Sequence, residues 1–142
     1  QNDAPLLRTF LSTPESSTVY ELDGTPVDLN EVVVDGQHSG TVVVWLRHYG
    51  CSLCRKLMSE IDSQIHSSLK DINFKLIAVG PGSCEHAEAT KNAVGFTGDI
   101  LSDPLRTTYR ALSFKRGVGV TFNLPALKAI IGSFKKGYQQ DW

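Results

Sequence analysis

The chain has 142 residues, of which 41% are hydrophobic and 20% are charged, and its formal net charge at pH 7 is −1. These values are typical of one soluble globular domain, and they exclude the strongly basic surface that binds nucleic acid or anionic membranes. The longest apolar runs are far shorter than the roughly 20 residues that span a bilayer. Three cysteines are too few for a disulfide scaffold, which favours a reducing intracellular compartment. The chain begins at Gln1 rather than at methionine, so we expect a natural N-terminus, with any targeting segment, to precede it.

The N-terminal part of the chain predicts a loose segment and then a small β element. Residues 1–18 are polar and contain prolines, and we expect them to precede a single domain over residues 19–142. Two short apolar runs, VYEL and VDL, flank the turn residues 23–26 (DGTP) and predict a β-hairpin. Residues 31–36 (EVVVDG) either extend this hairpin or cap it.

The middle of the chain has the pattern of a strand, a helix and a second strand. Residues 41–47 are apolar without alternation, as in a strand covered on both faces. Residues 52–69 predict a helix, and residues 73–80 predict the next strand. Apolar residues at three- and four-residue spacing give this helix its inward stripe: Leu57, Met58, Ile61, Ile65 and Leu69. Such a βαβ unit implies parallel strands and a right-handed crossover.

The second half of the chain continues the α/β pattern. A helix is predicted between Ser83 as its N-cap and Gly95 as its stop, and DILSDP supplies a short strand. Asp103 and Pro104 are suited to the N-cap and first position of the next helix, and a last helix is predicted over residues 123–137. The first of these two helices is expected to bury Leu105, Tyr109 and Leu112.

A pair of cysteines, Cys51 and Cys54, lies where the first buried strand ends and the helix begins. The first turn of a helix offers unpaired N–H groups and the positive end of the helix dipole, and both favour a thiolate. In this setting a Cys-x-x-Cys spacing lowers a cysteine pKa from about 8.5 to roughly 3.5–7.5. Arg47, His48 and Arg55 add positive charge on both sides. We therefore expect a substantial thiolate fraction at neutral pH.

The two sulfurs are expected to differ in exposure. At 100° per residue, Cys54 falls within the apolar stripe and should be half buried, whereas Cys51 lies at the helix mouth and should be accessible. An exposed nucleophile followed by a shielded thiol is the geometry for attack and then resolution through an intramolecular disulfide.

Other roles remain open for these residues and their neighbours. Cys84 and His86 could complete a zinc site with the pair, or both cysteines of the pair could simply pack. Cys84 is also a candidate second resolving thiol, and His48 either assists the chemistry by donating a proton or holding the thiolate, or is an exposed residue. Trp45 and Tyr109 are expected in the core. Three histidines are expected at the surface: His38, His66 and His86.

Several segments together resemble one family. VVVWLRHYGCSLCR, IAVGPGS, GDILSDPLRTTYRAL and GYQQDW are similar to the peroxiredoxin-like 2 proteins, which are AhpC/TSA-type antioxidant domain proteins of the thioredoxin-like superfamily and include plant chloroplast members. The resemblance runs from Val19 to the last residue. It implies an α/β thioredoxin-like fold with a central sheet flanked by helices, preceded here by the hairpin and lacking the C-terminal β-hairpin and final helix.

The resemblance also implies a function. It points to a thiol-dependent oxidoreductase that reduces peroxides, or in some relatives prostaglandin endoperoxides, with Cys51 and Cys54 as the redox pair and Arg47 and Arg55 beside it. Thioredoxin or another thiol reductant would be the electron donor, in the chloroplast or cytoplasm, with no cofactor or metal. The alternative is a redox-silent binding module. Typical peroxiredoxins carry Pro-x-x-x-Thr/Ser-x-x-Cys, whereas His48 stands three residues before Cys51 here. An uncovered helical layer would further favour a homodimer.

Overall fold

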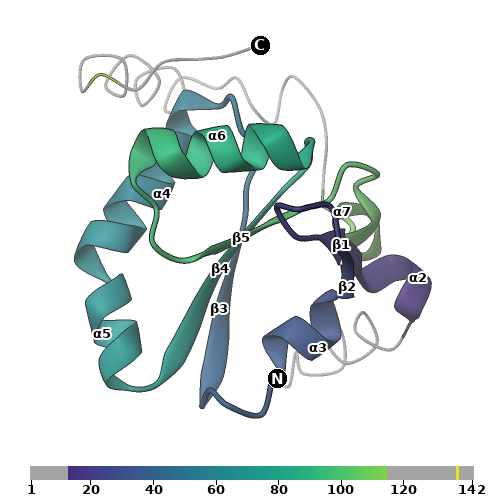
Figure 1. Cartoon of the computed structure of the whole chain (residues 1–142), viewed down its shortest axis with the longest axis horizontal. Coiled ribbons are helices and arrows are strands. Elements are labelled where there is room, and N and C mark those ends of the chain that lie inside the picture. The colour runs from purple at the N-terminus through teal and green to yellow at the C-terminus, as the bar shows by residue number, and fades with distance from the viewer. Residues whose placement is uncertain (1–12, 115–136, 138–142) are drawn as a thin grey trace.

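The computed structural model describes residues 13–114 and residue 137, and most of the helix predicted over 123–137 therefore lies outside the described residues. The described elements, in chain order, are α2 (Pro14–Ser17), β1 (Thr18–Tyr20), β2 (Pro26–Asp28), α3 (Leu29–Val33), β3 (Gly40–Trp45), α4 (Ser52–Gln64), α5 (His66–Asp71), β4 (Phe74–Gly80), α6 (Cys84–Val94), β5 (Asp99–Ser102) and α7 (Thr107–Ala111). Figure 1 shows a central sheet with helices on both sides. Within the described part, no helix is long and apolar enough to cross a membrane.

The described residues form a sheet of five strands in the order β2-β1-β5-β4-β3. β3, β4 and β5 are parallel neighbours, and β1 pairs antiparallel with both β2 and β5. The predicted βαβ unit and the N-terminal hairpin are therefore confirmed. The two crossover connections, β3-α4-α5-β4 and β4-α6-β5, move across the sheet in the same direction. Because parallel crossover connections share one handedness, α4, α5 and α6 all lie on the same face of the sheet.

The core consists of two clusters because successive residues of a strand point to opposite faces. Leu76 and Ala78 of β4 pack with Met58 of α4 and Ala87 of α6 in the first cluster. The alternate β4 residues, Ile77 and Val79, pack in the second cluster, on the side of α3 and α7. β3 is an edge strand of the described sheet and all six of its residues are half-buried, so it is less covered than its apolar sequence predicts.

Two short helices replace features that were expected to be irregular or extended. Residues 14–17, expected to be loose, form α2, and the side chain of Ser17 is fully buried. Of the two alternatives for residues 31–36, an extension of the hairpin is wrong, because residues 29–33 form the helix α3. The Asp28 carboxylate accepts a hydrogen bond of 2.8 Å from the backbone N–H of Asn30, which caps α3 and ends β2.

The helix predicted over residues 52–69 is broken at Ile65. Leu57 and Ile65 were expected to face inward, but they are 43% and 47% exposed. His66, expected at the surface, is buried instead. Its Nδ1 lies 2.8 Å from the Thr97 hydroxyl and 3.1 Å from the Asp62 carboxylate, so the helix break turns this side chain toward the segment that leads into β5.

The predictions for the second half are confirmed for α6 and corrected for α7. Ser83 caps α6 by accepting from the His86 N–H, and Gly95 ends it in a left-handed conformation. α7 begins at Thr107 rather than at Pro104, because Arg106 has a positive φ of 55°, a left-handed backbone conformation that cannot be part of a right-handed helix. Leu105 is consequently 64% exposed rather than buried.

Asp103 is a buried carboxylate that still organises the start of α7. It accepts hydrogen bonds from the backbone N–H and hydroxyl groups of Thr107 and Thr108, at 2.6–3.1 Å. The hydroxyl of Thr108 in turn accepts from Trp45 Nε1 at 3.2 Å. This network joins the end of β5, α7 and β3.

We expect Asp103→Ala to lower the free energy of unfolding by about 3 kcal/mol, since hydrogen bonds to a charged group contribute roughly 1.5–3 kcal/mol each and are not additive. Urea denaturation measures the change. Asp99→Ala is the matched control, because Asp99 is exposed and forms an ion pair with Lys75 at 3.2 Å. An exposed pair of this kind contributes less than about 1 kcal/mol. Equal effects of the two substitutions would contradict a structural role for Asp103.

Candidate active site

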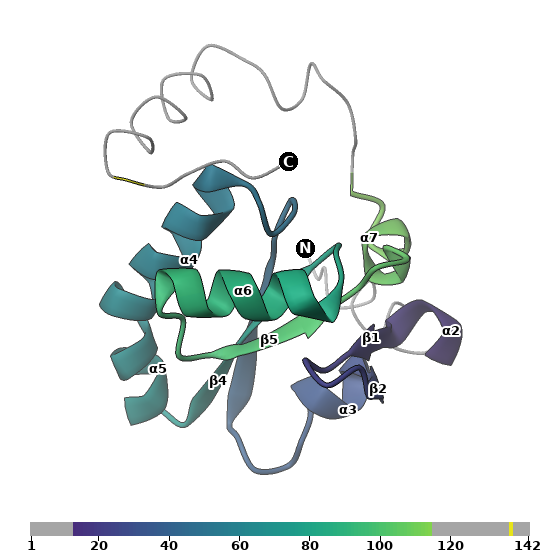
Figure 2. The ribbon, with the colours of Figure 1, turned by 45° about the horizontal axis from the view of Figure 1, so that its top comes forward.

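The two cysteines lie at the carboxyl end of β3, where the chain passes through residues 46–50 into α4. Cys51 is the N-cap residue of α4, and Cys54 lies in its first turn. Figure 2 shows the loop between β3 and α4 beside α6, which begins after the carboxyl end of the neighbouring strand β4. The candidate site therefore forms where two parallel strands end and two helices begin.

Tyr49 fixes this loop to the sheet and to α6. Its side chain is buried, and its hydroxyl donates a hydrogen bond of 2.7 Å to the Leu101 carbonyl oxygen. Its own carbonyl oxygen accepts from Arg55 Nε at 3.1 Å and from the Thr90 hydroxyl at 3.2 Å. The loop is thus held from β5, α4 and α6, and the cysteine that follows it has a defined position.

Cys51 is the sulfur that favours the thiolate. A hydrogen bond from the Cys54 thiol lowers the pKa of Cys51 to about 5, against the opposing effect of burial. The backbone N–H groups of Cys54 and Leu53 and the positive charge of Arg47 lower this pKa further. The structure therefore gives a physical cause for a predominantly ionised Cys51 at neutral pH.

Cys54 is the sulfur that remains protonated. Its hydrogen bond to Cys51, its burial and the negative charge of the Cys51 thiolate all raise its pKa. The backbone N–H of Arg47 also donates to Cys54 Sγ at 3.2 Å. The pair thus shares one proton unequally: Cys54 donates and Cys51 accepts.

The exposure predicted for Cys51 is wrong. Cys51 is 4% exposed and Cys54 is 8% exposed, so both sulfurs are buried. The helical phase that predicted an accessible Cys51 does not apply to it, because an N-cap residue lies outside the helix and has extended backbone, here with φ −74° and ψ 119°. Its side chain packs in the same cluster as Leu46 and Met58.

His48 is near Cys51 but is not a cation that stabilises its thiolate. Burial lowers the pKa of His48, and the charges of Arg47, Arg106 and Arg55 lower it further, while the Cys51 thiolate acts in the opposite direction. His48 is therefore mainly neutral at pH 7. The positive charge near the site comes from the arginines. Arg106 lies far away in the sequence, within GDILSDPLRTTYRAL, and its place in that segment of the family resemblance was the one available signal for it.

The described residues do not assemble the alternative metal site. Among residues 13–114, no three histidine, cysteine, aspartate or glutamate side chains are grouped so as to hold a metal ion, which overturns the zinc site of Cys51, Cys54, Cys84 and His86. All three cysteines are free thiols, and Cys84 is half-buried. His38 and His86 are exposed as predicted, whereas Trp45 and Tyr109 are half-buried against the second core cluster.

Two residues that matter for the loop, Tyr49 and Thr90, had no predicted role. The aromatic residue before Gly50 in HYGC belongs to the segment that carries the family resemblance, and this was the one available signal for Tyr49. Thr90 gives no signal of its own, because its contact joins residues that are 41 positions apart.

The protonation states lead to a prediction for alkylation. We expect the iodoacetamide reaction of Cys51 to rise with pH through an apparent pKa of about 5 and to be nearly flat from pH 7 to 8. Cys54→Ala removes the donated hydrogen bond and should shift the rise to higher pH. Mass spectrometry of the Cys51 peptide after timed quenching measures the rate. A rise centred near pH 8.5 in the unaltered protein would contradict the proton arrangement.

The fold and this junction define a class of protein: a thioredoxin-like α/β fold with paired thiols at the start of the first helix of its βαβ unit. The model of the AhpC/TSA antioxidant enzyme family matches residues 60–141, more than half of the chain. The chain therefore belongs to the AhpC/TSA family. The matched span begins nine residues after Cys51, at Glu60, so it does not include the cysteine pair.

Individual proteins agree with this assignment. The chain is 34% identical over 128 residues to the thioredoxin-like protein AAED1, chloroplastic, of Arabidopsis thaliana, covering 87% of this chain and 48% of that protein. It is 30% identical to peroxiredoxin-like 2C of Bos taurus, covering 70% and 42%. The crystal structure of the peroxidoxin BcpB of Mycobacterium tuberculosis matches with a TM-score of 0.61 at 15% identity, covering 71% and 63%, which confirms the thioredoxin-like fold. The chain spans about half the length of these two curated relatives.

Proposed function

We propose that the chain is a peroxiredoxin-like thiol oxidoreductase that reduces hydroperoxides through Cys51 and Cys54, in an antioxidant role. Family membership supports a thiol oxidoreductase. The observation that carries the finer proposal is the geometry of the pair: Cys51 is the N-cap of α4, Cys54 lies in its first turn, and the hydrogen bond between them lowers the pKa of Cys51 and raises that of Cys54. A packing pair of cysteines needs no such arrangement.

The first step consumes the hydroperoxide. The Cys51 thiolate attacks one peroxide oxygen, so an S–O bond forms while the O–O bond breaks. The leaving alkoxide takes a proton from solvent and departs as an alcohol, and Cys51 becomes a sulfenic acid. Because Cys51 is 4% exposed, a hydroperoxide has only a narrow approach to the sulfur. The neutral His48 beside Cys51 is suited to donate a hydrogen bond to the leaving oxygen.

The second step closes a disulfide. The Cys54 sulfur attacks the sulfenic sulfur, so an S–S bond forms while the S–O bond of the sulfenic acid breaks. The proton that Cys54 gives up passes to the departing hydroxyl group, which leaves as water. A dithiol reductant such as thioredoxin then exchanges with the disulfide, returning both thiols and becoming oxidised itself. Cys54 already contacts Cys51 by a hydrogen bond, so resolution requires little movement.

Intact mass measurement tests the proposal. One equivalent of hydrogen peroxide should remove two hydrogen atoms from the protein, and peptide mapping should join Cys51 to Cys54. The alternative, a redox-silent binding module, predicts no mass change and full alkylation of both cysteines after the same treatment. A disulfide that includes Cys84 would contradict the assignment of Cys54 as the resolving residue.

The electron donor, compartment and assembly are also proposals. Thioredoxin is the first donor to test against glutathione, and the chloroplastic Arabidopsis relative makes the chloroplast the first compartment to examine, before the cytoplasm. Reduction of endoperoxides is the alternative substrate chemistry. Homodimerisation stays a prediction from the sequence, and a mass of one chain by light scattering at high concentration would contradict it.

A further inference from the structure

A cavity of about 200 Å³ lies beside the cysteine loop. It is bordered on one side by the loop and the start of α4, and on the other by α6 and the segment that leads into it. Its lining residues are His48, Tyr49, Gly50, Arg55, Pro81, Gly82, His86, Ala89 and Thr90. Cys51 is not among them, but His48 is close enough to Cys51 to respond to its charge. The cavity is therefore a neighbour of the reacting sulfur and is separate from it.

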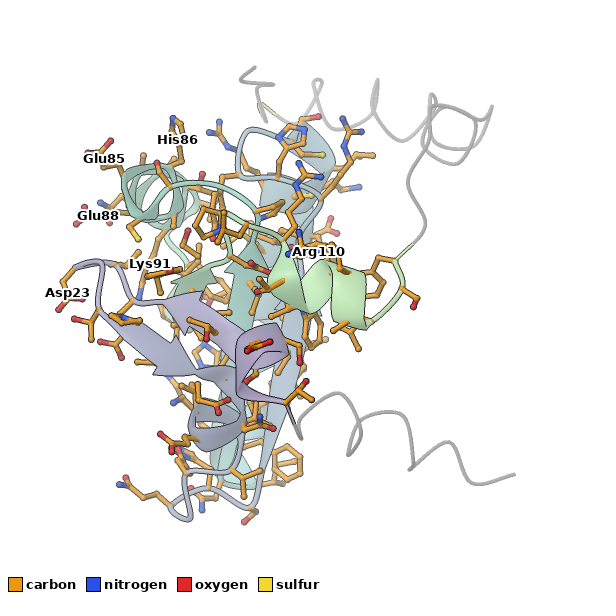
Figure 3. All side chains as sticks on the ribbon, turned by 90° about the vertical axis from the view of Figure 1, so that its right-hand side faces the viewer. Asp23, Glu85, His86, Glu88, Lys91 and Arg110 are labelled. Carbon is orange, nitrogen blue, oxygen red and sulfur yellow. The ribbon has the colours of Figure 1, made fainter. Side chains whose placement is uncertain are left out.

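The polar lining of this cavity suits an anion. Arg55 contributes a permanent positive charge, and its bond to the Tyr49 carbonyl oxygen holds the side chain beside the cavity. His86 contributes an imidazole group, which can donate a hydrogen bond to a carboxylate. Among the residues that the structure describes, no aspartate or glutamate lines the cavity. Figure 3 shows His86 extending from a different side of α6 than Glu85 and Glu88, so the acidic residues of this helix point elsewhere.

The size and the apolar lining restrict the ligand further. Small-molecule pockets that enclose a whole drug-sized ligand have roughly 300–1,000 Å³. This cavity is smaller, at about 200 Å³, so it suits a head group and a short stretch of chain. Pro81, Gly82 and Ala89 give it an apolar wall against which methylene groups can pack.

We propose that this cavity binds the carboxylate end of a small organic reactant, placing the rest of the molecule near Cys51. The binding of a carboxylate stands by itself, but the placement of a reactant near Cys51 rests on the proposed function. In that function the carboxylate belongs either to a hydroperoxide substrate or to the thiol reductant. Both sources share the chemistry that the cavity recognises. A carboxylated reactant is thus favoured over its neutral counterpart of the same shape.

Binding is tested without any redox reaction by titrating the full chain with hexanoate and, separately, with the neutral hexanamide, and following NMR shifts of Ala89 and Thr90. Hexanoate is expected to bind at least about tenfold more tightly, as hydrogen bonds to a charged group are stronger than neutral ones. His86→Glu should remove this preference, whereas Asn92→Glu places the same charge on α6 outside the cavity and should preserve it. Equal affinity for the two ligands would overturn the proposal.

A second pair of variants tests the location of the site. Ala89→Leu fills the cavity and should weaken hexanoate binding at least about tenfold, because overpacking a formed cavity leaves no room for the ligand. Ala93→Leu adds the same side chain at another exposed position of α6, outside the cavity lining, and should change the affinity less than about twofold. Unchanged binding in Ala89→Leu would place the carboxylate elsewhere and overturn the proposal.

The two sources are distinguished by the half-reactions. If the oxidant carries the carboxylate, Cys51 oxidation by a hydroperoxy acid should be about tenfold faster than by its methyl ester, and His86→Glu should remove the difference. If the reductant carries the carboxylate, glutathione should reduce the oxidised cysteine pair about tenfold faster than its diester does, and His86→Glu should remove this difference. If neither the oxidant nor the reductant reacts faster as the acid than as the ester, the cavity does not place a reactant near Cys51, and this part of the proposal is overturned. Failure of every hydroperoxide to oxidise Cys51, with hexanoate still bound, would instead reject the proposed function and leave the cavity site standing.

Discussion

Replacement of Cys51 by serine is expected to lower hydroperoxide-dependent thiol oxidation about a thousandfold or more, because loss of an enzymatic nucleophile leaves only residual catalysis. Serine retains the size of the side chain, but its hydroxyl does not ionise near neutral pH, so the hydrogen bond from Cys54 has no anion to stabilise. A coupled assay with thioredoxin and its reductase measures the loss. Circular dichroism should show an unchanged fold, since Cys51 contributes one small side chain to its cluster.

The partner substitutions separate the roles of the three thiols. Cys54→Ser should still allow the first oxidation, so a sulfenic acid accumulates on Cys51 and a dimedone adduct appears there by mass spectrometry. Cys84→Ser is the matched control and should leave turnover within about twofold, as expected for a substitution away from the reacting groups. If Cys51→Ser retained full activity, or if Cys84→Ser abolished it, the assignment of the Cys51 and Cys54 pair would be wrong.

The position of the pair was predictable because it depends on local patterns. Two apolar runs separated by an amphipathic stretch define the βαβ unit, and the Cys-x-x-Cys spacing falls at its first helix. Helical periodicity gave a wrong exposure for Cys51, which lies one residue before the first residue of α4. Helical phase describes Cys54, which lies within α4, but not Cys51, which has extended backbone at the N-cap. Burial of Cys51 is therefore a property of loop geometry that residue spacing does not contain.

Other errors arose where long-range contacts decide the local structure. Nothing in the apolar stripe of residues 52–69 indicates that the helix breaks at Ile65, since the break accompanies the contacts of His66 with Asp62 and with Thr97 in a distant segment. Similarly, Pro104 is a normal first residue of a helix, yet α7 begins later, after the positive φ of Arg106. The first residue of α7, Thr107, donates a hydrogen bond to the carbonyl oxygen of Thr18, 89 positions away. Pairwise contacts over more than thirty residues are not visible in periodicity.

Tyr49 is expected to be the residue of the loop whose loss most affects stability. Tyr49→Ala should lower the free energy of unfolding by about 4 kcal/mol, the usual effect of deleting a buried aromatic ring. Burial raises the pKa of Tyr49, so its hydroxyl remains protonated and donates to the Leu101 carbonyl oxygen throughout the accessible pH range. Tyr49→Phe should therefore lower the free energy by only about 1–2 kcal/mol, through the lost hydrogen bond. Urea denaturation of both variants, with the exposed Val34→Ala as a control, measures these differences.

The packing around the Tyr49 ring gives an independent test from the opposite side. A Cβ added at Gly80 or Gly82 would come closer to the ring atoms of Tyr49 than real Cβ atoms do, and the buried ring has little room to move. Gly80→Ala should therefore destabilise the wild-type protein by about 1–3 kcal/mol, as overpacking does, but should be much less harmful once Tyr49 is alanine. A double-mutant cycle measures this coupling. Additive effects of Gly80→Ala and Tyr49→Ala on the free energy of unfolding would show that the ring and the glycine act independently, and would contradict the packing of Tyr49 against Gly80. Since Tyr49 positions the loop that leads to Cys51, the same variants should also slow Cys51 alkylation at pH 7.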